Sequence, residues 1–399
     1  MEPDLRQALI ARLSSKEEEL RRAAMEGLKE GLAEEDLQWL VGPLSDESWR
    51  VRKEAIDGLS RIIPSSSLVN HLVPMMDPSR ELTLRNSIVE VLERMGRDAA
   101  PFILEHIGTQ QQDVRKFLVD ILGNIADPAT LPGLLELLHD PEDNIRAAAA
   151  EALASVGDPS VCDALLKAIA VSDEWVIFSI LGSLARLRSV KALPVFFQFL
   201  GDHILAKPAL TGIGLLGGLQ EGMRLLAMLP DLSRGAAKTS FLALGAIYRR
   251  LARSESREDA EKLRVEVSRR ADETIVQFLV AQLAVSDQHE KKQDILGGLG
   301  MIGGREALDA IIALVEDEDL GWDVDLALYS AAMGDLAVVT AMLDHGNPFV
   351  RRKVVQTLGR LGRDGSLPYL KGMLSDESGH VRKDAAKALA AMGDTSCVQ

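Results

Sequence analysis

The stretch from Leu131 to Asp158, LPGLLELLHDPEDNIRAAAAEALASVGD, decides the fold of this chain. Leucines recur in its first third at i, i+3, i+4 and i+7, which places them on one face of a helix. Asp140-Pro141 indicates a turn, because proline cannot continue the first helix and can begin the next. A second apolar stripe follows, and Gly157 ends it. Neither helix can bury its stripe alone, so the stretch predicts a helix pair that stacks on others.

The same pattern recurs along the chain. Leu367 to Asp394, LPYLKGMLSDESGHVRKDAAKALAAMGD, aligns with the first stretch without a gap. An apolar residue followed by arginine marks the second helix in seven of the repeats, and most neighbouring pairs lie about 31 residues apart. These pairs are Leu20-Arg21, Val51-Arg52, Leu84-Arg85, Val114-Arg115, Ile145-Arg146, Val350-Arg351 and Val381-Arg382. The period predicts an all-α, right-handed α-solenoid of about twelve two-helix repeats.

Aspartates at the turns between paired helices precede the arginines by a constant interval. Asp46, Asp140 and Asp376 each stand six residues before an arginine. In a stack, such an aspartate can accept hydrogen bonds from the arginine of its own or the next repeat. The alternative is a basic inner face built from the same arginines. We favour the structural ladder.

Composition limits the classes of partner and location. The formal net charge of −15 disfavours nucleic acid, whose phosphates need a basic face. The first residues, MEPDLRQAL, do not form a signal peptide, and the longest apolar stretch, Ile204 to Leu219, is too short to span a bilayer. Two distant cysteines, Cys162 and Cys397, fit a reducing compartment. We therefore expect a cytoplasmic protein that binds neither nucleic acid nor membrane.

The short two-helix repeat resembles the HEAT repeat. The residues that carry the resemblance are the Asp-Pro turn, the apolar-Arg pair that begins the second helix, and the closing Gly-Asp. The form is similar to the short bilin-lyase (PBS lyase) HEAT-like repeat. The resemblance implies a solenoid but not one function, since the family includes scaffolds, adaptors, transport factors and a few enzymes. The di-iron hydroxylases built on this repeat carry several His-Glu dipeptides, whereas this chain has one, His289-Glu290.

The period breaks after the eighth repeat. We expect repeats one to eight over residues 1–251, a helical insertion over 252–272 that extends the first helix of repeat nine, and repeats nine to twelve over 273–399. Ser256, with Asp259 three residues later, is an N-cap signature. The pattern predicts one helix from about Arg257 to Leu283, whose first half projects beyond the solenoid edge. This half is either a solvated spacer or a docking arm.

Catalytic, cofactor and metal sites have no signature in the chain. The seven histidines lack metal-ligand spacing. The acidic run over 316–325 is not an EF-hand loop, because Trp322 and Leu328 stand where glycine and glutamate are required; it is better explained as a helix N-terminus, and cation binding there stays open. The recurring glycines Gly123, Gly214, Gly245, Gly300 and Gly359 predict close helix packing. We expect no enzyme, no cofactor and no metal.

Repeats six to eight lack the ladder arginine and are sparsely charged. On our register, positions equivalent to Ala147 and Ala150 face outward, and large apolar side chains replace them there. The predicted partner-binding residues are Phe178, Leu181, Lys207, Leu210, Lys238 and Phe241. They predict a scaffold or adaptor that binds an amphipathic, partly acidic helix of a partner protein on the concave face.

Three other interpretations stay open. A register slip of one residue would place the same side chains in the core. The chain could form a homodimer through the apolar middle repeats. It could also be a chromophore or cofactor lyase subunit, or a small-molecule binder, that uses the apolar central groove.

Overall fold

The computed structural model describes residues 3–109, 111–254 and 256–394. In this part of the chain the regular secondary structure consists of 25 α-helices and short 3₁₀ turns. Twelve pairs of consecutive helices follow one another, and a single additional helix, α17 (Arg257–Arg270), stands between the eighth and ninth pairs. The predicted all-α solenoid is confirmed. None of the described helices is both long and apolar enough to cross a bilayer.

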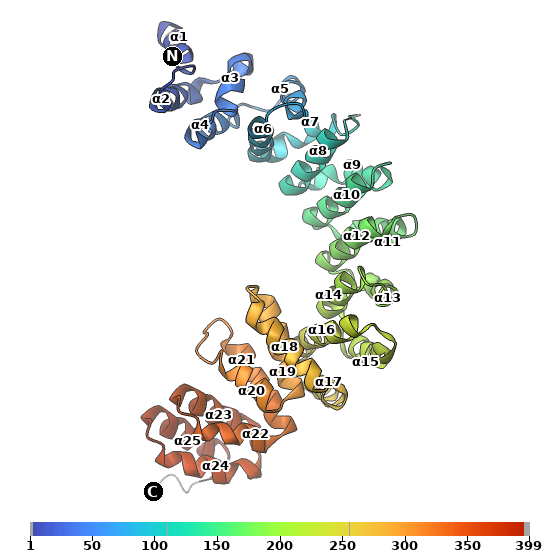
Figure 1. Ribbon diagram of the computed structural model, residues 1–399, viewed down its shortest axis with the longest axis vertical. Helices are drawn as coiled ribbons and strands as arrows, with labels where there is room; N and C mark the ends of the chain where they lie inside the picture. Colours follow the sequence, from blue (N-terminus) through green and yellow to red (C-terminus); the bar gives the residue numbers. More distant parts are fainter. Residues whose placement is uncertain (1–2, 110, 255, 395–399) are drawn as a thin grey trace. The chain divides into compact units, whose positions relative to one another are not determined.

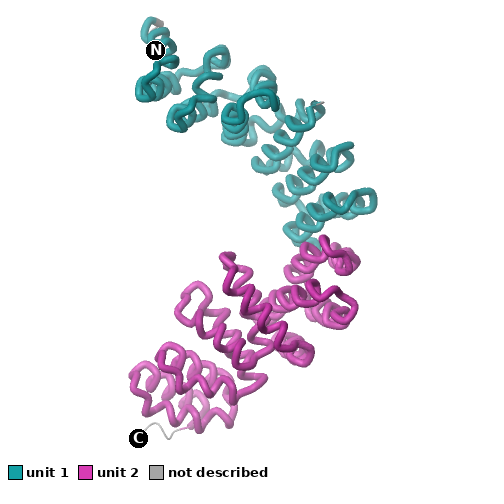
Figure 2. The backbone as a smooth tube through the Cα atoms, in the orientation of Figure 1, with its two compact units in different colours: residues 1–189 teal, residues 190–399 magenta. Residues whose placement is uncertain are grey.

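The chain divides into two compact units, residues 1–189 and 190–399 (Figure 2). Unit 1 contains α1 (Pro3–Arg12), α2 (Glu18–Leu28), α3 (Leu37–Leu44), α4 (Trp49–Leu59), α5 (Ser66–Leu72), α6 (Leu82–Met95), α7 (Ala100–Leu104), α8 (Gln112–Ile125), α9 (Leu131–Glu136), α10 (Asp143–Val156), α11 (Cys162–Ile169) and α12 (Glu174–Arg186). Unit 2 contains α13 (Leu193–Gln198), α14 (Ala206–Leu216), α15 (Leu219–Met228), α16 (Arg234–Arg253), α17, α18 (Glu273–Val285), α19 (His289–Ile302), α20 (Arg305–Ile312), α21 (Gly321–Gly334), α22 (Leu336–Thr340), α23 (Pro348–Leu361), α24 (Leu367–Gly372) and α25 (Gly379–Ala391). The division predicted from the sequence, at 251/252 and 272/273, stays a prediction.

The second helices of the pairs form a continuous layer in each unit. In unit 1, α2, α4, α6, α8, α10 and α12 each pack on the next, and in unit 2 the same holds for α14, α16, α19, α21, α23 and α25 (Figure 1). A second helix is therefore buried on two flanks as well as against its own first helix. Both Ala147 and Ala150 of α10 are buried for this reason.

Glycines let these second helices approach closely. A Cβ placed on Gly123 of α8 would lie 3.0 Å from the Cα of Ala152 in α10. A Cβ on Gly300 of α19 would lie 2.6 Å from the Cα of Ala327 in α21. Larger side chains at these positions would push the backbones apart. The close packing expected from the recurring glycines is confirmed.

The arginines that follow the apolar anchors form the expected ladder. Arg351 contacts Asp376 of the next repeat at 2.8 Å, and the same separation of 25 residues joins Arg21 to Asp46 at 2.6 Å. The Asp376 carboxylate also accepts from the backbone N–H of Ser378, at the start of its own second helix. The Arg351 hydrogen bond holds the pKa of Asp376 below its usual range.

The ladder differs from expectation in its direction. The aspartate accepts from the arginine of the preceding repeat, while the arginine of its own repeat reaches backbone carbonyls. Arg382, for example, donates to the carbonyl oxygens of Asp376 and Glu377 at 2.6 and 3.0 Å. The turns at Asp46, Asp140 and Asp376 are thus held both by their own helices and by the repeat before them.

The structure shows two helices where one was expected after the eighth repeat. α17 ends at Arg270, Ala271 is extended, and the Asp272 carboxylate accepts from the backbone N–H of Ile275 at 3.1 Å. An aspartate in this position caps a new helix, which is why α18 begins at Glu273. α17 does not project from the array: it packs on α15, α16 and α19 and buries Leu263 and Val267.

Candidate functional site

The six predicted partner-binding residues do not form one exposed surface. Leu181, Leu210 and Phe241 are buried, because their helix positions face the flanks where second helices pack on one another. The expectation that these three are exposed was wrong: they lie in the core, and no register slip is needed to place them there, because the equivalent Ala147 and Ala150 are buried too. Phe178 is 40% exposed, and its ring lies 6.5 Å from that of Trp175. Phe178 and Leu181 belong to unit 1, whereas the other four residues belong to unit 2.

Unit 2 contains a groove of about 710 Å³ on its second-helix layer. We call it the unit 2 groove; it is lined by parts of α14, α16 and α18, the first turns of α19, and the connecting loops. Two predicted residues take part, because Lys207 and Leu210 of α14 both line it. Leu242 of α16 and Phe278 of α18 contribute further apolar surface.

Cations border the apolar lining of the unit 2 groove. Lys238, also predicted from the sequence, places its ammonium 6.0 Å from the centroid of the Phe278 ring. Lys291 lines the groove and donates to the side-chain oxygen of Gln282 at 2.8 Å. Val285, the last residue of α18, has 74% of its surface exposed at the same groove. Acids line the groove too, namely Asp202, Asp287, Glu290 and Asp294, so it combines apolar contact area with charges of both signs.

A half-buried acid lies at one end of the groove. Asp294 of α19 lines the groove and accepts from the guanidinium of Arg249 in α16 at 2.8 Å. Burial raises the pKa of Asp294 to about 6, although Arg249 opposes this shift. At neutral pH, the protonated fraction of this carboxyl group is therefore larger than that of an exposed aspartate.

A second buried acid extends this network away from the groove. Asp323 of α21 is 2% exposed and accepts from the Gln293 side chain at 2.9 Å. Arg253 lies 3.6 Å from the Asp323 carboxylate and stacks over the Trp322 ring at 4.1 Å. Burial raises the pKa of Asp323 as well. Sequence reasoning missed this network, since its members lie on three helices and share no spacing.

The network sits beside an unusually close helix contact. A Cβ on Gly245 of α16 would lie 2.0 Å from the backbone carbonyl oxygen of Asp294. A Cβ on Gly297 of α19 would lie 2.7 Å from the carbonyl oxygen of Gly245. The backbones of α16 and α19 are therefore in contact here. Most residues of α16 that line the groove lie between this contact and the N-terminus of α16.

The acidic run over 316–325 is engaged in structural contacts. Asp317 accepts from the backbone N–H groups of Asp319 and Leu320, at 3.1 and 3.2 Å, just before α21. Asp325 pairs with Lys353 of α23 at 2.6 Å. These contacts agree with the explanation of the run as a helix N-terminus.

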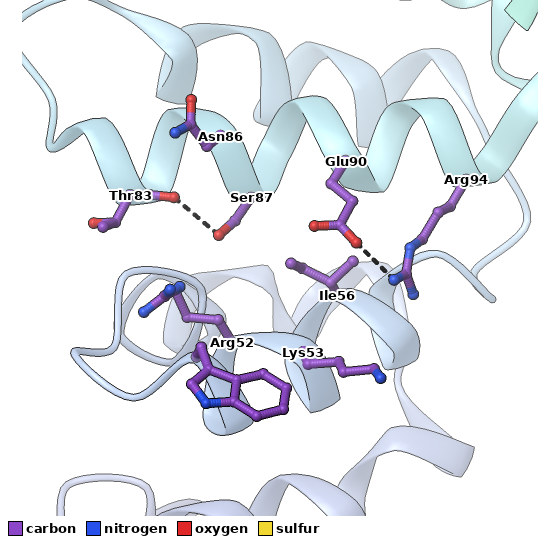
Figure 3. Close-up of a pocket in the computed structure, with 9 residues that line it drawn as sticks. Arg52, Lys53, Ile56, Thr83, Asn86, Ser87, Glu90 and Arg94 are labelled. Atoms are coloured by element: carbon purple, nitrogen blue, oxygen red, sulfur yellow. Dashed lines mark hydrogen bonds and ion pairs between the residues drawn. The ribbon is translucent and has the colours of Figure 1, made fainter. Parts of the chain in front are cut away.

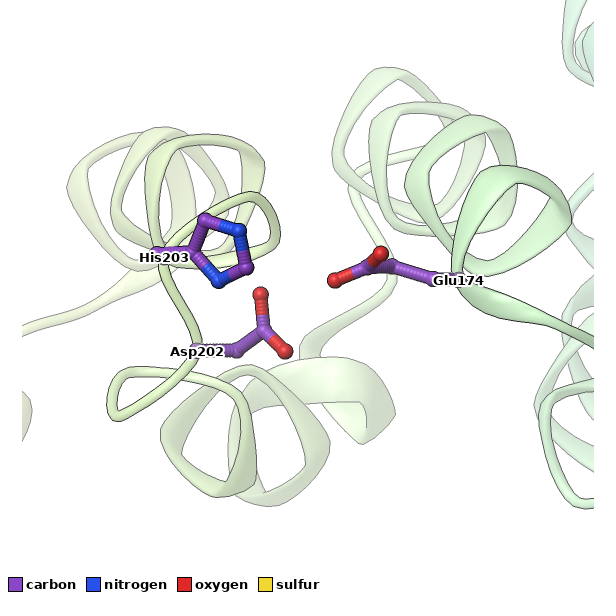
Figure 4. A group of neighbouring side chains, drawn as sticks. All are labelled: Glu174, Asp202 and His203. Carbon is purple, nitrogen blue, oxygen red and sulfur yellow. The ribbon is translucent and has the colours of Figure 1, made fainter.

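The turn before α14 brings Asp202 and His203 together (Figure 4). The Asp202 carboxylate accepts from the backbone N–H groups of Ile204 and Leu205, both at 2.8 Å. Its contacts are those of a capping residue. Glu174, drawn in the same figure, belongs to unit 1. Two groups from one turn are too few ligands to define a metal site.

Comparison with known proteins identifies the family. The model of the family described as HEAT repeats matches residues 6–93, 69–147, 100–185, 131–206 and 336–399. These matches together cover more than half of the chain, so the chain belongs to the HEAT-repeat family. No curated protein sequence matches it.

Solved structures are similar in fold. A crystal structure of importin beta aligns with a TM-score of 0.53 at 10% identity, over 98% of this chain and 67% of that one. An engineered protein aligns at 20% identity over 98% of this chain and 99% of that one, with a TM-score of 0.34. A Kap121p mutant aligns at 12% identity with a TM-score of 0.44, and this chain spans 53% of its length. The importin beta likeness supports the solenoid fold.

Proposed function

We propose that this chain is a non-catalytic scaffold or adaptor that binds a partner protein in the unit 2 groove. The observation that carries the proposal is the groove itself, an open surface with apolar side chains and with charges of both signs. An amphipathic helix places apolar side chains in such a groove at i, i+3, i+4 and i+7. Acids on the flanks of that helix would meet Lys207, Lys238 and Lys291, and bases on it would meet the acids of the lining. The site retains Lys207, Leu210 and Lys238 of the predicted residues, and Leu242, Phe278 and Val285 supply further apolar surface.

The finer features of the family assignment are part of the same proposal. The repeats are of the short bilin-lyase (PBS lyase) HEAT-like form, which is supported by first helices as short as the five residues of α7 and α22. The acidic composition and the two distant cysteines support a cytoplasmic location. Neither feature assigns lyase chemistry to this chain.

A small-molecule or cofactor binder is the second candidate. The volume of the unit 2 groove, about 710 Å³, lies in the range of small-molecule sites. A second copy of this chain is another occupant to test. Both alternatives give outcomes in the experiment below that differ from those of a partner protein.

Site-specific photocrosslinking in the cells that produce the protein tests the proposal. A photoreactive residue replaces Val285 in the groove, and the control replaces Val171, a valine in unit 1 that is 72% exposed. We expect position 285 to give one discrete crosslinked protein that position 171 does not. A second substitution, Leu242→Glu, should remove that product, because it places a charge on the apolar lining.

Three results would contradict the proposal. The same products at both positions would indicate random collisions. A crosslinked band of twice the chain mass would identify a second copy of this chain. No crosslinked protein, together with a small molecule that copurifies with the unmodified chain and not with Leu242→Glu, would favour the small-molecule binder.

A further inference from the structure

One arginine of the ladder in unit 1 lacks its acidic partner although the sequence supplies it. Asp77 stands 25 residues after Arg52, the separation found in the ladder pairs. The Asp77 carboxylate instead accepts from the backbone of Ser79 at 2.8 Å and from the Gln111 side chain at 2.7 Å. Arg52 donates to two backbone carbonyls of its own turn. Among the described residues, no carboxylate lies within ion-pair distance of Arg52.

Arg52 lines a cavity of about 430 Å³ between α4 and α6 (Figure 3). Lys53, the next residue of α4, also lines it, and no described side chain pairs with its exposed ammonium. On the facing helix, Arg94 pairs with Glu90 at 2.6 Å and also with Asp57 of α4, so its charge is fully compensated. The cavity therefore carries two positive charges without acidic partners.

Neutral groups add further donors around these cations. Thr83 and Asn86 of α6 line the cavity with a hydroxyl and an amide. Trp49, the first residue of α4, contributes an indole N–H and a ring that is 64% exposed. Ile56 supplies apolar surface. A ligand that suits this set carries several acceptor oxygens beside an apolar or aromatic group.

We propose that this cavity binds an acidic peptide segment of a partner protein. Two neighbouring carboxylates of the segment contact Arg52 and Lys53, and an adjacent apolar side chain packs on Trp49. Charge favours a short peptide over a nucleic acid. A nucleic acid that extended beyond the cavity would be repelled by the rest of the protein, whose net charge is −15. The site lies in unit 1 and is separate from the unit 2 groove, so it goes beyond the function proposed above.

Fluorescence anisotropy with the full chain and defined probes tests this site. The first probe is a labelled short peptide in which glutamates flank one phenylalanine; the second replaces its glutamates by glutamines; the third is a labelled oligouridine. We expect only the glutamate peptide to bind, and Lys53→Gln to weaken binding about tenfold. Lys53 is exposed and makes no hydrogen bond or ion pair in the described chain, so this variant should fold normally.

Arg50→Gln is the matched control. It removes the same charge from the same helix, but Arg50 is paired with Glu19 and lies 3.6 Å from Glu18. We expect its effect on peptide binding to stay within about twofold. Trp49→Phe should abolish the change in intrinsic tryptophan fluorescence on binding. Val285→Glu in unit 2 should leave peptide binding unchanged, which separates this site from the proposed function.

The proposal is overturned by any of three results. The first is that the glutamate peptide fails to bind the intact chain. The second is that Lys53→Gln and Arg50→Gln weaken binding equally, which would indicate general charge attraction. The third is that oligouridine binds with the same dependence on Lys53, which would identify a nucleic-acid site.

Discussion

Two contacts between second helices in unit 2 achieve close packing by different means. Where α23 meets α25, Gly359 faces the Ala388 side chain, and the Arg351–Asp376 ion pair connects the turns. Where α16 meets α19, the ladder arginine is replaced by Ala237, and Gly245 brings the two backbones into contact. The cation that binds an acid there is Arg249, about three turns further along the helix than the ladder position at Ala237.

The difference shows how one repeat can be both a packing unit and a site. A ladder contact fills its turn with an arginine and an aspartate that satisfy each other. The α16–α19 contact moves the charge pair to the end of a groove and leaves the start of α16 to line it. α17 packs beside this contact and has no counterpart in the other described repeats. The groove therefore lies in the part of unit 2 where the chain departs from the repeat pattern.

The largest expected effect is on the ladder contact. Arg351→Leu leaves the buried Asp376 carboxylate without its cation, and we expect it to destabilise α23–α25 by about 4 kcal/mol. Arg382→Leu removes an arginine that donates only to backbone carbonyls and should cost about 1 kcal/mol. Hydrogen exchange of the α25 amides measures both. Equal effects would show that the ion pair adds nothing to the ladder.

The glycine contact should be the next most sensitive. Gly245→Ala places a methyl group against the backbone of α19, so the helices must separate, and we expect a loss of about 3 kcal/mol. Gly182→Ala in α12 is the control, since no atom lies within 4 Å of its added Cβ. Alanine is the better helix former, so this variant should be about 1 kcal/mol more stable. Urea unfolding followed by circular dichroism compares the two, and a stable Gly245→Ala would refute the tight contact.

The pH dependence of the α16–α19 contact should have the opposite sign to that of the ladder. Asp294 faces Arg249 and Arg250 of α16 and Glu290 of its own helix, and its folded pKa of about 6 lies above the unfolded value near 3.8. The folded state therefore binds the additional proton, and stability rises as the pH falls from 7 to 5, by about 1.4 kcal/mol. Asp376, whose pKa is lowered, loses its contribution only below its unfolded pKa.

Hydrogen exchange of α19 amides at pH 7 and pH 5, corrected for intrinsic rates, measures this dependence. Asp294→Asn should remove it. A contact in α16–α19 that weakens between pH 7 and 5 would contradict the raised pKa.

The fold was predictable because its signal is repeated and local. Leu131 and Leu367 begin helices in the structure as their spacing predicts, and Arg351 meets Asp376 in the ladder. The burial of Leu181, Leu210 and Phe241 was not predictable in the same way. Helical periodicity places a residue on one face, but it does not say how many neighbours cover that helix, and a second helix here is covered on both flanks.

The groove depends on tertiary contacts that the sequence records only indirectly. Lys207 and Lys238 were found because they replace small residues of the repeat, whereas Phe278 and Val285 lie on a first helix and followed no such rule. The half-buried Asp294 and the buried Asp323 could not be distinguished from exposed acids by spacing. The break before α18 had a readable signal, because Asp272-Glu273 is an N-cap followed by an acid in the first turn.

The smallest expected effect is at this cap. Asp272→Ala removes the hydrogen bond to the Ile275 N–H and should cost about 1 kcal/mol. Asp173→Ala is the matched control in unit 1, since Asp173 caps α12 through the Val176 N–H at the same distance of 3.1 Å. Two residues separate α17 from α18, whereas four separate α11 from α12. Only the loss of Asp272 is therefore expected to join its two helices, since alanine at 272 favours a continuous helix through Ala271.

Carbon chemical shifts of residues 270–275 test the helix state, and hydrogen exchange gives the energy. If Asp272→Ala leaves Ala271 extended and α18 unchanged, then the packing of α17 on α15 and α16, and not the cap, determines where α17 ends. Joining of the two helices would instead move Phe278 and Val285 relative to α16. The groove should then lose its lining, and the Val285 crosslink should be lost with it, while Asp173→Ala leaves that crosslink intact.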